Sequence, residues 1–288
     1  MFDTLLFKKI GENTSNELKQ YIPAYNYIKN SYYTIRFRFK YDKYATKYKK
    51  DIRYNKYIDQ INRFHNIHKD ERCFILGSGP SLKNTNLNLI KNEIIFGVNT
   101  VFKILPKYDL KCKYYNIGDI NVWKEHYKQI LSQDTTLFMG GILANNDYLN
   151  NYGYYSQFQK NEPILIRFRG PLRLKKEWGD NDLTKGNYGA HQIIANQSLQ
   201  LAHYMGFKKV YLLGCDCDYT GRNHHFDGEN YSHQPTSTIK STQYWDETFK
   251  EYDMIGKGFE KTGGKVYNAT VGGKLGVFER VKLEDVFR

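Results

Sequence analysis

Two carboxylates and three imidazoles lie close together in the last third of the chain. Asp216 and Asp218 follow a short apolar run, and His224, His225 and His233 come soon after them. Carboxylates bind Mg²⁺ together with phosphate groups, and an imidazole can accept a proton from a sugar hydroxyl near neutral pH. We therefore predict a catalytic or ligand-binding loop, with Asp216, His225 and His233 as catalytic candidates. In the alternative interpretation Asp216 caps a loop and the histidines are exposed.

Two cysteines alternate with these carboxylates, at Cys215 and Cys217. A zinc site made of both thiols and a histidine would need an irregular backbone that aims the two side chains the same way. With Cys73 and Cys112 included, the spacing fits neither a disulfide framework nor a zinc ribbon. We expect reduced thiols in a cytoplasmic protein and no firm metal site.

A glycine-rich turn is the second region that could do chemistry. An apolar run at 73–76 predicts a buried strand, and the chain then turns through Gly77, Ser78, Gly79, Pro80 and Ser81. Backbone N–H groups between a strand and a helix can bind a phosphate, and the helix dipole adds positive potential. Gly-x-Gly is also an ordinary structural turn, and neither a dinucleotide fingerprint nor a Walker loop is complete here. Both interpretations stay open.

Polar side chains also stand at the ends of the next two predicted strands. They are Asn99 and Thr100 after the run at 94–98, and Asn116 and Asp119 around the end of the run at 112–117. Open α/β sheets bind ligands beyond the carboxyl ends of their strands, and an Asn amide can bind the polar edges of a nucleotide. The alternative role for these residues is in Asx turns.

A third candidate is the segment that precedes a clear helical pattern ending at Gly206. Asn187 and Gly189 open this pattern, so N–H groups there are expected to hold a phosphate or carboxylate. His191 lies in the first predicted turn. It either faces the site or caps the helix, and the sequence does not distinguish the two.

The order of these elements predicts an α/β fold. Apolar runs that read as strands alternate with helical patterns, which indicates a Rossmann-like, doubly wound, mostly parallel sheet over residues 71–288. The predicted strands are 73–76, 94–98, 112–117, 137–140, 210–213 and 265–269, and the predicted helices are 82–91, 101–105, 190–205 and 238–257. Residues 142–185 are irregular and are expected to form a lid or acceptor wall.

Residues 1–70 read as a basic helical extension. They hold 15 Lys/Arg against 7 Asp/Glu, which is +8 of the net charge of +13, and ten tyrosines lie between residues 21 and 60. Such a segment suits an anionic membrane surface, a partner, or simple cover for the main domain. No nucleic-acid-binding motif is present. No transmembrane run or signal peptide is expected, so we predict a cytoplasmic protein at the inner face of the cytoplasmic membrane.

Taken together, the motifs resemble the MptE-like family (domain of unknown function 115). The resemblance covers roughly residues 70–282 and is carried by the order and spacing of several segments. These are Gly77–Leu82, Ile94–Thr100, Gly118–Asp119, Gly189–His191 with its helix to Lys208, Val210–Tyr219, Lys265–Thr270 and Gly272–Leu275. The resemblance implies a Rossmann-like fold and either pterin diphosphokinase activity or a glycosyltransferase that handles nonulosonic acids.

The chain is also distantly similar to bacterial sialyltransferases of capsule and lipooligosaccharide synthesis. On that comparison Asn99 and Asn116 match asparagines that contact the nucleotide, and Asp216 matches a strand-end aspartate. Ser78 stands where those enzymes have asparagine. The resemblance thereby implies a CMP-linked donor.

The same comparison bears on the phosphate and the base. Asp218 and His224 stand where the sialyltransferases place two phosphate-binding tyrosines, with Tyr219 next door. His233 lies four residues before the position of their catalytic histidine, which is Ser237 here.

Three functions follow as hypotheses. The first is a glycosyltransferase that moves a sugar from a CMP-type nucleotide donor to a surface glycan or its precursor. The second is a 6-hydroxymethylpterin diphosphokinase that uses ATP and Mg²⁺, with Asp119, Asp216 and Asp218 as metal ligands. The third is a nucleotide-binding protein without catalysis.

Overall fold

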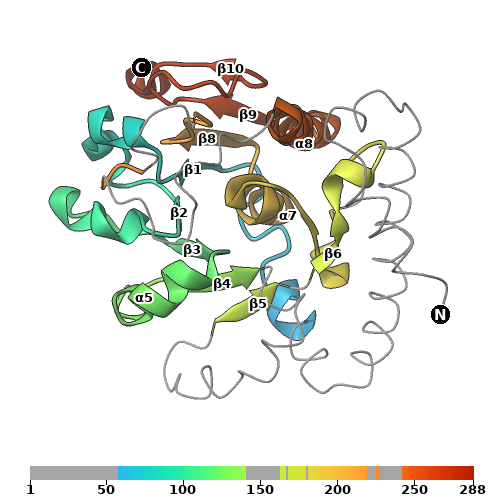
Figure 1. Cartoon of the computed structure of the whole chain (residues 1–288), viewed down its shortest axis with the longest axis horizontal. Coiled ribbons are helices and arrows are strands. Elements are labelled where there is room, and N and C mark those ends of the chain that lie inside the picture. Colours follow the sequence, from blue (N-terminus) through green and yellow to red (C-terminus); the bar gives the residue numbers. More distant parts are fainter. Residues whose placement is uncertain (1–57, 141–162, 167, 180, 219–224, 228–241) are drawn as a thin grey trace, which may run out of the picture. The chain divides into compact units, whose positions relative to one another are not determined.

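The computed structural model describes residues 58–140, 163–166, 168–179, 181–218, 225–227 and 242–288 (Figure 1). All of them belong to one unit, Asn55–Arg288. Most of the predicted extension, residues 1–57, lies outside the described residues, so its helices and its membrane contact stay predictions. No described helix combines the length and the apolar character that crossing a membrane requires.

A parallel sheet organises the described part of the chain and confirms the predicted fold class. Its eight strands follow the order β10-β9-β8-β1-β2-β3-β4-β5, and every described pairing is parallel. The strands are β1 Arg72–Leu76, β2 Ile95–Val98, β3 Tyr114–Ile117, β4 Thr136–Gly140, β5 Ile164–Ile166, β8 Lys209–Leu213, β9 Lys265–Asn268 and β10 Glu279–Arg280. A separate parallel pair joins β6 Phe168–Pro171 and β7 Asn187–Gly189.

The strand order places a topological switch point between β1 and β8. From β1 the chain moves outward to β5, and it then returns to β8 on the other side of β1. Connections therefore leave these two neighbouring strands in opposite directions, which opens a crevice beyond their carboxyl ends. In this fold class such a crevice is where ligands bind.

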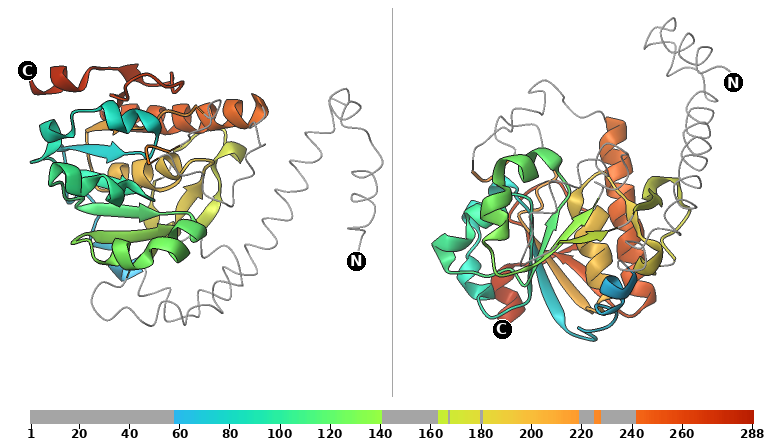
Figure 2. Two further views of the ribbon diagram at one scale, coloured as in Figure 1. Left: turned by 60° about the vertical axis from the view of Figure 1, so that its left-hand side comes forward. Right: turned by 90° about the horizontal axis from the view of Figure 1, so that it is seen from below.

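Helices cover both faces of the sheet, as Figures 1 and 2 show. On one face α7 Leu199–Tyr204, preceded by a π-helical turn at Ile194–Ser198, packs beside α8 Thr242–Lys261. On the other face lie α5 Ile120–Leu131 and the short 3₁₀ turns between residues 80 and 108. Because both faces are covered, the central strands are continuous apolar runs. The 3₁₀ turns of the described chain are Pro80–Asn84, Leu87–Ile90, Val101–Lys103, Leu105–Tyr108, Leu172–Leu174, Leu183–Lys185 and Leu283–Phe287.

Several predicted elements differ from the structure. The helices expected at 82–91 and 101–105 are pairs of 3₁₀ turns, because extended backbone at Thr85 and a proline at 106 interrupt them. Helix α5 was not predicted; the Asp119 carboxylate caps its start. The helical pattern expected from residue 190 begins at Ile194, since residues 187–189 form a strand. Residues 142–185 fall partly outside the described residues, and their described part contains β5 and β6.

His203 of α7 is enclosed by aromatic rings on the side of the sheet that faces α8. Its ring lies edge-on to Trp178 at 4.8 Å and to Phe259 at 4.9 Å, measured between ring centroids. Its Nδ1 lies 2.9 Å from the Asn181 amide nitrogen, a donor, so this nitrogen accepts and carries no proton. Burial lowers the pKa of His203 to about 4.

We predict that His203 makes the fold sensitive to mild acid. Between pH 6.5 and 4 the unfolded chain binds a proton at this residue and the folded chain does not, so stability falls as the pH falls. The loss should approach about 3 kcal/mol near pH 4. Urea unfolding of wild type and His203→Gln at several pH values measures it, with the exposed His65→Gln as control. An acid slope unchanged in His203→Gln would contradict the prediction.

Candidate functional site

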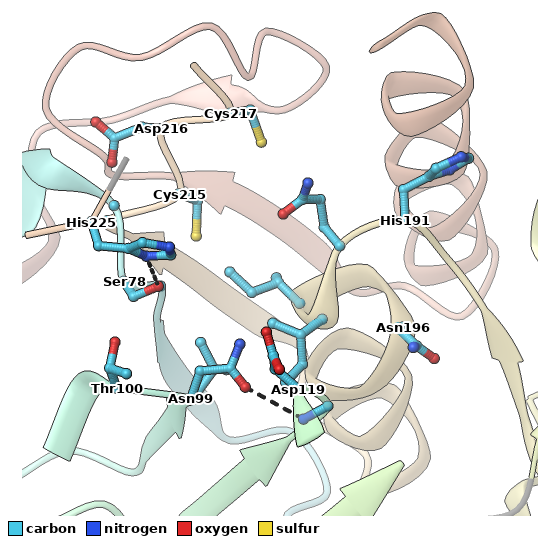
Figure 3. Close-up of a pocket in the computed structure, with 18 of the residues that line it drawn as sticks. Ser78, Asn99, Thr100, Asp119, His191, Asn196, Cys215, Asp216, Cys217 and His225 are labelled. Atoms are coloured by element: carbon cyan, nitrogen blue, oxygen red, sulfur yellow. Dashed lines mark hydrogen bonds between the residues drawn. The ribbon is translucent and has the colours of Figure 1, made fainter. Parts of the chain in front are cut away.

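A cleft of about 450 Å³ lies beyond the carboxyl ends of β1, β2, β3 and β8, at the switch point (Figure 3). This size suits a nucleotide-sized ligand. The residues that line it come from several segments far apart in the sequence: Gly77, Ser78, Gly79, Val98, Asn99, Thr100, Gly118, Asp119, Val122, Ala190, His191, Gln192, Ile193, Ile194, Asn196, Gly214, Cys215, Asp216, Cys217, Asp218, His225 and Tyr252. The structure thus brings together most of the predicted strand-end residues.

The glycine turn after β1 is bound to the loop after β8. The Gly77 N–H donates to the Leu213 carbonyl at 2.7 Å, and the Gly79 N–H donates to the Gly214 carbonyl at 2.9 Å. A Cβ atom at either glycine would overlap atoms of the β8 loop. Glycine is needed here because two backbones approach closely, and these two N–H groups already have acceptors within the protein. The structural interpretation of Gly-x-Gly therefore accounts for both glycines.

Asp216 fastens the same two loops together. Its Oδ1 accepts the Ser81 backbone N–H at 3.2 Å, and its Oδ2 accepts the Ser81 hydroxyl at 2.8 Å. Burial raises the pKa of Asp216, although the hydrogen bonds from Ser81 act in the opposite direction. Asp216, which the sequence predicted to be catalytic, lines the cleft, but both oxygens of its carboxylate accept hydrogen bonds from Ser81 of the glycine turn.

The other two candidate carboxylates also have partners within the protein. One oxygen of Asp119 accepts the N–H groups of Asn121 and Val122 and so caps α5. Asp218 forms an ion pair with Lys274, whose Nζ lies 3.0 Å from Oδ1. Each of the three carboxylates therefore stabilises an element of the fold.

Neutral polar groups face the cleft after β2. Asn99 has a left-handed backbone, with φ +46°, and its side-chain oxygen accepts the Gly118 N–H at 3.4 Å. The Thr100 hydroxyl is buried and has no hydrogen-bond partner among the described residues. A buried hydroxyl without a partner is unfavourable, so a ligand that bonds to it would bind more tightly. Figure 3 shows both side chains on the same side of the cleft.

His225 lines the cleft and belongs to a short segment, residues 225–227, which we call the strap. Its Nδ1 lies 3.1 Å from the Ser78 hydroxyl, and the Phe226 N–H donates to the Ser78 carbonyl at 2.9 Å. Asp227 forms an ion pair with Lys103 at 3.0 Å. The strap is thereby fixed to the loops that follow β1 and β2, and it holds the imidazole next to the glycine turn (Figure 3).

The two cysteines of the β8 loop are buried thiols that line the cleft (Figure 3). Cys217 has a left-handed backbone, φ +48°, which is the irregularity that a shared site would need. However, burial raises the pKa of both thiols, that of Cys217 to about 12. Within the described residues no group of three or more His, Cys, Asp or Glu side chains could hold a metal ion. His224 and His233 lie outside the described residues, so a zinc site of both thiols and a histidine stays an untested alternative.

Some predicted residues do not reach the cleft. Asn116 is fully buried in β3 and accepts the Ser198 hydroxyl at 3.2 Å. Asn187 is buried in β7, where its amide donates to the side chain of Asn196 at 2.7 Å. Pro80, Ser81 and Gly189 are likewise absent from the lining. Three further candidates, Tyr219, His224 and His233, lie outside the described residues and stay predictions.

The structure also brings in residues that the sequence did not assign to the site. Gln192, Asn196 and Tyr252 line the cleft, and so does His191, for which the sequence left two roles open. Behind His191 stands Glu251 of α8, which is fully buried. Its position inside an amphipathic helical pattern gave no signal of this contact. None of the described residues between 163 and 185 lines the cleft, and the expectation of a lid or acceptor wall in residues 142–185 stays a prediction.

Comparison with known proteins identifies a family and several solved structures, of which one is described here. The family model described as 6-hydroxymethylpterin diphosphokinase MptE-like matches residues 46–222. The solved structure is the MAf glycosyltransferase from Magnetospirillum magneticum AMB-1, with a TM-score of 0.41 and 12% identity, covering 80% of this chain and 38% of that one. The chain thus spans well under half of that protein, and at this TM-score we draw no argument from the likeness. No curated protein matches the chain.

Replacing Gly79 tests whether the glycine turn is needed for the stability of the fold or for binding a ligand. In Gly79→Ala the new Cβ would overlap the Asp216 carboxylate and lie 2.6 Å from the Gly214 carbonyl oxygen. We expect a loss of about 1–3 kcal/mol of stability in urea unfolding. Gly276→Ala is the control, since its nearest neighbouring atom would be 3.9 Å away. Wild-type stability with loss of nucleotide binding would instead make the turn a ligand contact.

Proposed function

From the premise that this chain belongs to the MptE-like family, whose model spans residues 46–222, we propose that its cleft is the active site of a nucleotide-dependent transferase. We propose that it transfers a sugar, of the nonulosonic or sialic acid type, from a CMP-linked donor. The acceptor is a hydroxyl group of a surface glycan or of its precursor. The cleft lies at the switch point of a parallel sheet, where this fold class binds nucleotides.

The observation that carries the proposal is the difference between the carboxylates of the cleft and its other polar side chains. Asp119, Asp216 and Asp218 are bonded to protein donors. The other polar side chains of the lining are amides, hydroxyls and imidazoles, several of which also have partners within the protein. Such neutral groups bind a base, a ribose or a sugar ring through hydrogen bonds. They suit glycosyl transfer, in which charge develops on the departing phosphate and is stabilised by placed donors.

In this proposal each part of the cleft has a role. Asn99 and Thr100 bind the nucleoside, and Asp216 holds the glycine turn in place. His225 contacts the donor phosphate, positioned by Ser78. The acceptor hydroxyl loses its proton to a general base and its oxygen bonds to the anomeric carbon, while the bond from that carbon to the phosphate oxygen breaks and its electron pair leaves with the nucleotide.

The family description supports a second candidate, the transfer of diphosphate from ATP to a pterin. That reaction depends on Mg²⁺, which prefers carboxylate oxygens and water in octahedral geometry. Among the described residues no three ligating side chains converge, and the three carboxylates have other partners. These residues do not fit a three-carboxylate Mg²⁺ site, and we derive no step through the metal.

The proposal includes a location for the acceptor. The basic, tyrosine-rich residues 1–70 would bring the enzyme to an anionic membrane surface, where lipid-linked precursors are found. Their charge of +8 is the observation behind this part of the proposal.

We predict that CMP stabilises the folded protein. A ligand that binds only the folded state at a hundred times its Kd adds about 2.7 kcal/mol, or about 5 to 10 °C in Tm for a domain of this size. A thermal-shift panel of CMP, CDP, UDP, GDP and ATP, each with Mg²⁺ and with EDTA, measures it. A shift with CMP in EDTA is the expected result. A shift with ATP and Mg²⁺ alone would replace the proposal with the diphosphokinase.

Asn99→Gly tests the proposed nucleoside contact. Glycine tolerates the left-handed backbone, so the change removes the amide with little strain. We expect CMP affinity to fall by about tenfold, the value of one hydrogen bond. Asn66→Gly is the matched control, an identical change at φ +57° on a residue that does not line the cleft. Equal CMP affinity in both variants, by calorimetry, would remove Asn99 from the site.

A further inference from the structure

Lys274 lies beside the cleft, in the loop that joins β9 to β10, residues 269–278. Its Nζ is 3.0 Å from Oδ1 of Asp218, which lines the cleft. The Lys274 backbone N–H donates to the Asp216 carbonyl at 2.7 Å, so main chain and side chain both contact the loop after β8. An ammonium group has three donors, and this side chain is 54% exposed. It can therefore bond to a ligand as well as to Asp218.

The loop that carries Lys274 has a tightly bonded backbone. The Arg280 guanidinium donates to four of its carbonyl oxygens, those of Thr270, Gly272, Gly273 and Leu275. Gly272 and Gly273 have left-handed backbones, with φ +70° and +73°, and a Cβ at Gly273 would lie 2.7 Å from the Asp216 carbonyl oxygen. An exposed ion pair contributes little to stability and needs no such support. The loop is therefore built to hold the lysine at one place.

The charges around the cleft show why a cation is needed there. Three carboxylates line the cleft, those of Asp119, Asp216 and Asp218, and the described lining includes no lysine or arginine. A nucleotide carries negative charge on its phosphate, and carboxylates repel it unless a cation lies close by. Lys103 is in an ion pair with the strap, and its side chain is only 20% exposed. Lys274 is more open to a ligand, so it is the better placed of these two lysines to meet a phosphate.

We propose that Lys274 binds the phosphate of the nucleotide donor, which competes with Asp218 for the ammonium group. This inference rests on the proposed transferase function and adds a cation to the phosphate contact assigned to His225. Figure 3 shows Asp216 and His225 on the same side of the cleft, and Asp218 follows Asp216 in the loop after β8. A cation beside the phosphate also favours the transfer, because negative charge develops on the phosphate as the nucleotide leaves.

The test is that changes to the two partners of the ion pair have opposite effects on CMP binding. Lys274→Met removes the cation, so CMP affinity should fall by about tenfold, the value of a hydrogen bond to a charged group. Asp218→Asn removes the competing carboxylate, so CMP affinity should rise by about two- to fivefold, the value of an exposed ion pair. Cytidine, which has no phosphate, should bind wild type and both variants equally. Calorimetry with CMP and with cytidine measures these affinities, and added salt should reduce the differences for CMP.

Matched controls keep the outcomes distinct. Lys257→Met changes a lysine that is 65% exposed, pairs with Asp253 and does not line the cleft, so it should keep wild-type CMP affinity. Lys274→Arg keeps the charge and should retain most of the affinity. Lys274→Gln replaces Lys274→Met should that variant fold poorly, judged by circular dichroism and Tm.

Three results would contradict the inference. Wild-type CMP affinity in the folded Lys274→Met variant overturns the inference alone. Equal losses of CMP affinity in Lys274→Met and Asp218→Asn do the same, because they would make the ion pair purely structural. A wild-type protein that binds no nucleotide overturns the proposed function and the inference together.

Discussion

The loops that follow β1 and β8 approach each other so closely that backbone meets backbone. Gly77 and Gly79 donate to carbonyls of the β8 loop, and Gly214, at φ +65°, allows that loop to turn away from the strand. Asp216 then bonds to Ser81 across the joint. Backbone hydrogen bonds and the contact between Asp216 and Ser81 thus hold together the loops of two neighbouring strands whose connections leave in opposite directions. The cleft, the strap over it and the orientation of its walls all depend on this joint.

The joint also decides which groups are left for chemistry. Three aspartates at strand ends have the composition of a metal site, but Asp119 caps a helix, Asp216 closes the joint and Asp218 pairs with Lys274. A carboxylate that accepts several N–H or O–H bonds has fewer lone pairs for a cation. The other polar side chains that line the cleft are amides, hydroxyls and imidazoles, which can both donate and accept hydrogen bonds.

Buried side chains of the loop after β8 and of α8 line part of the cleft. Cys215 and Cys217 are buried thiols with raised pKa values, and Tyr252 of α8 reaches the lining between other buried side chains. Electrostatic interactions are stronger where water is excluded. Glu251 of α8 is fully buried in this region, and its Oε2 accepts the His191 backbone N–H at 2.8 Å.

From the amino-acid sequence, six of the eight strands of the sheet could be predicted, together with the edge where their carboxyl ends meet. Strands buried on both faces are continuous apolar runs, and the carboxyl ends of parallel strands meet at one edge, so Asn99, Asp119 and Asp216 could be placed together from order alone. Only the tertiary structure decided what each polar group bonds to. Glu251 meets His191 across 60 positions of sequence, and such a contact depends on how α8 packs on the sheet. Local spacing reports which face a residue occupies, whereas hydrogen-bond partners are chosen by elements that fold together from distant parts of the chain.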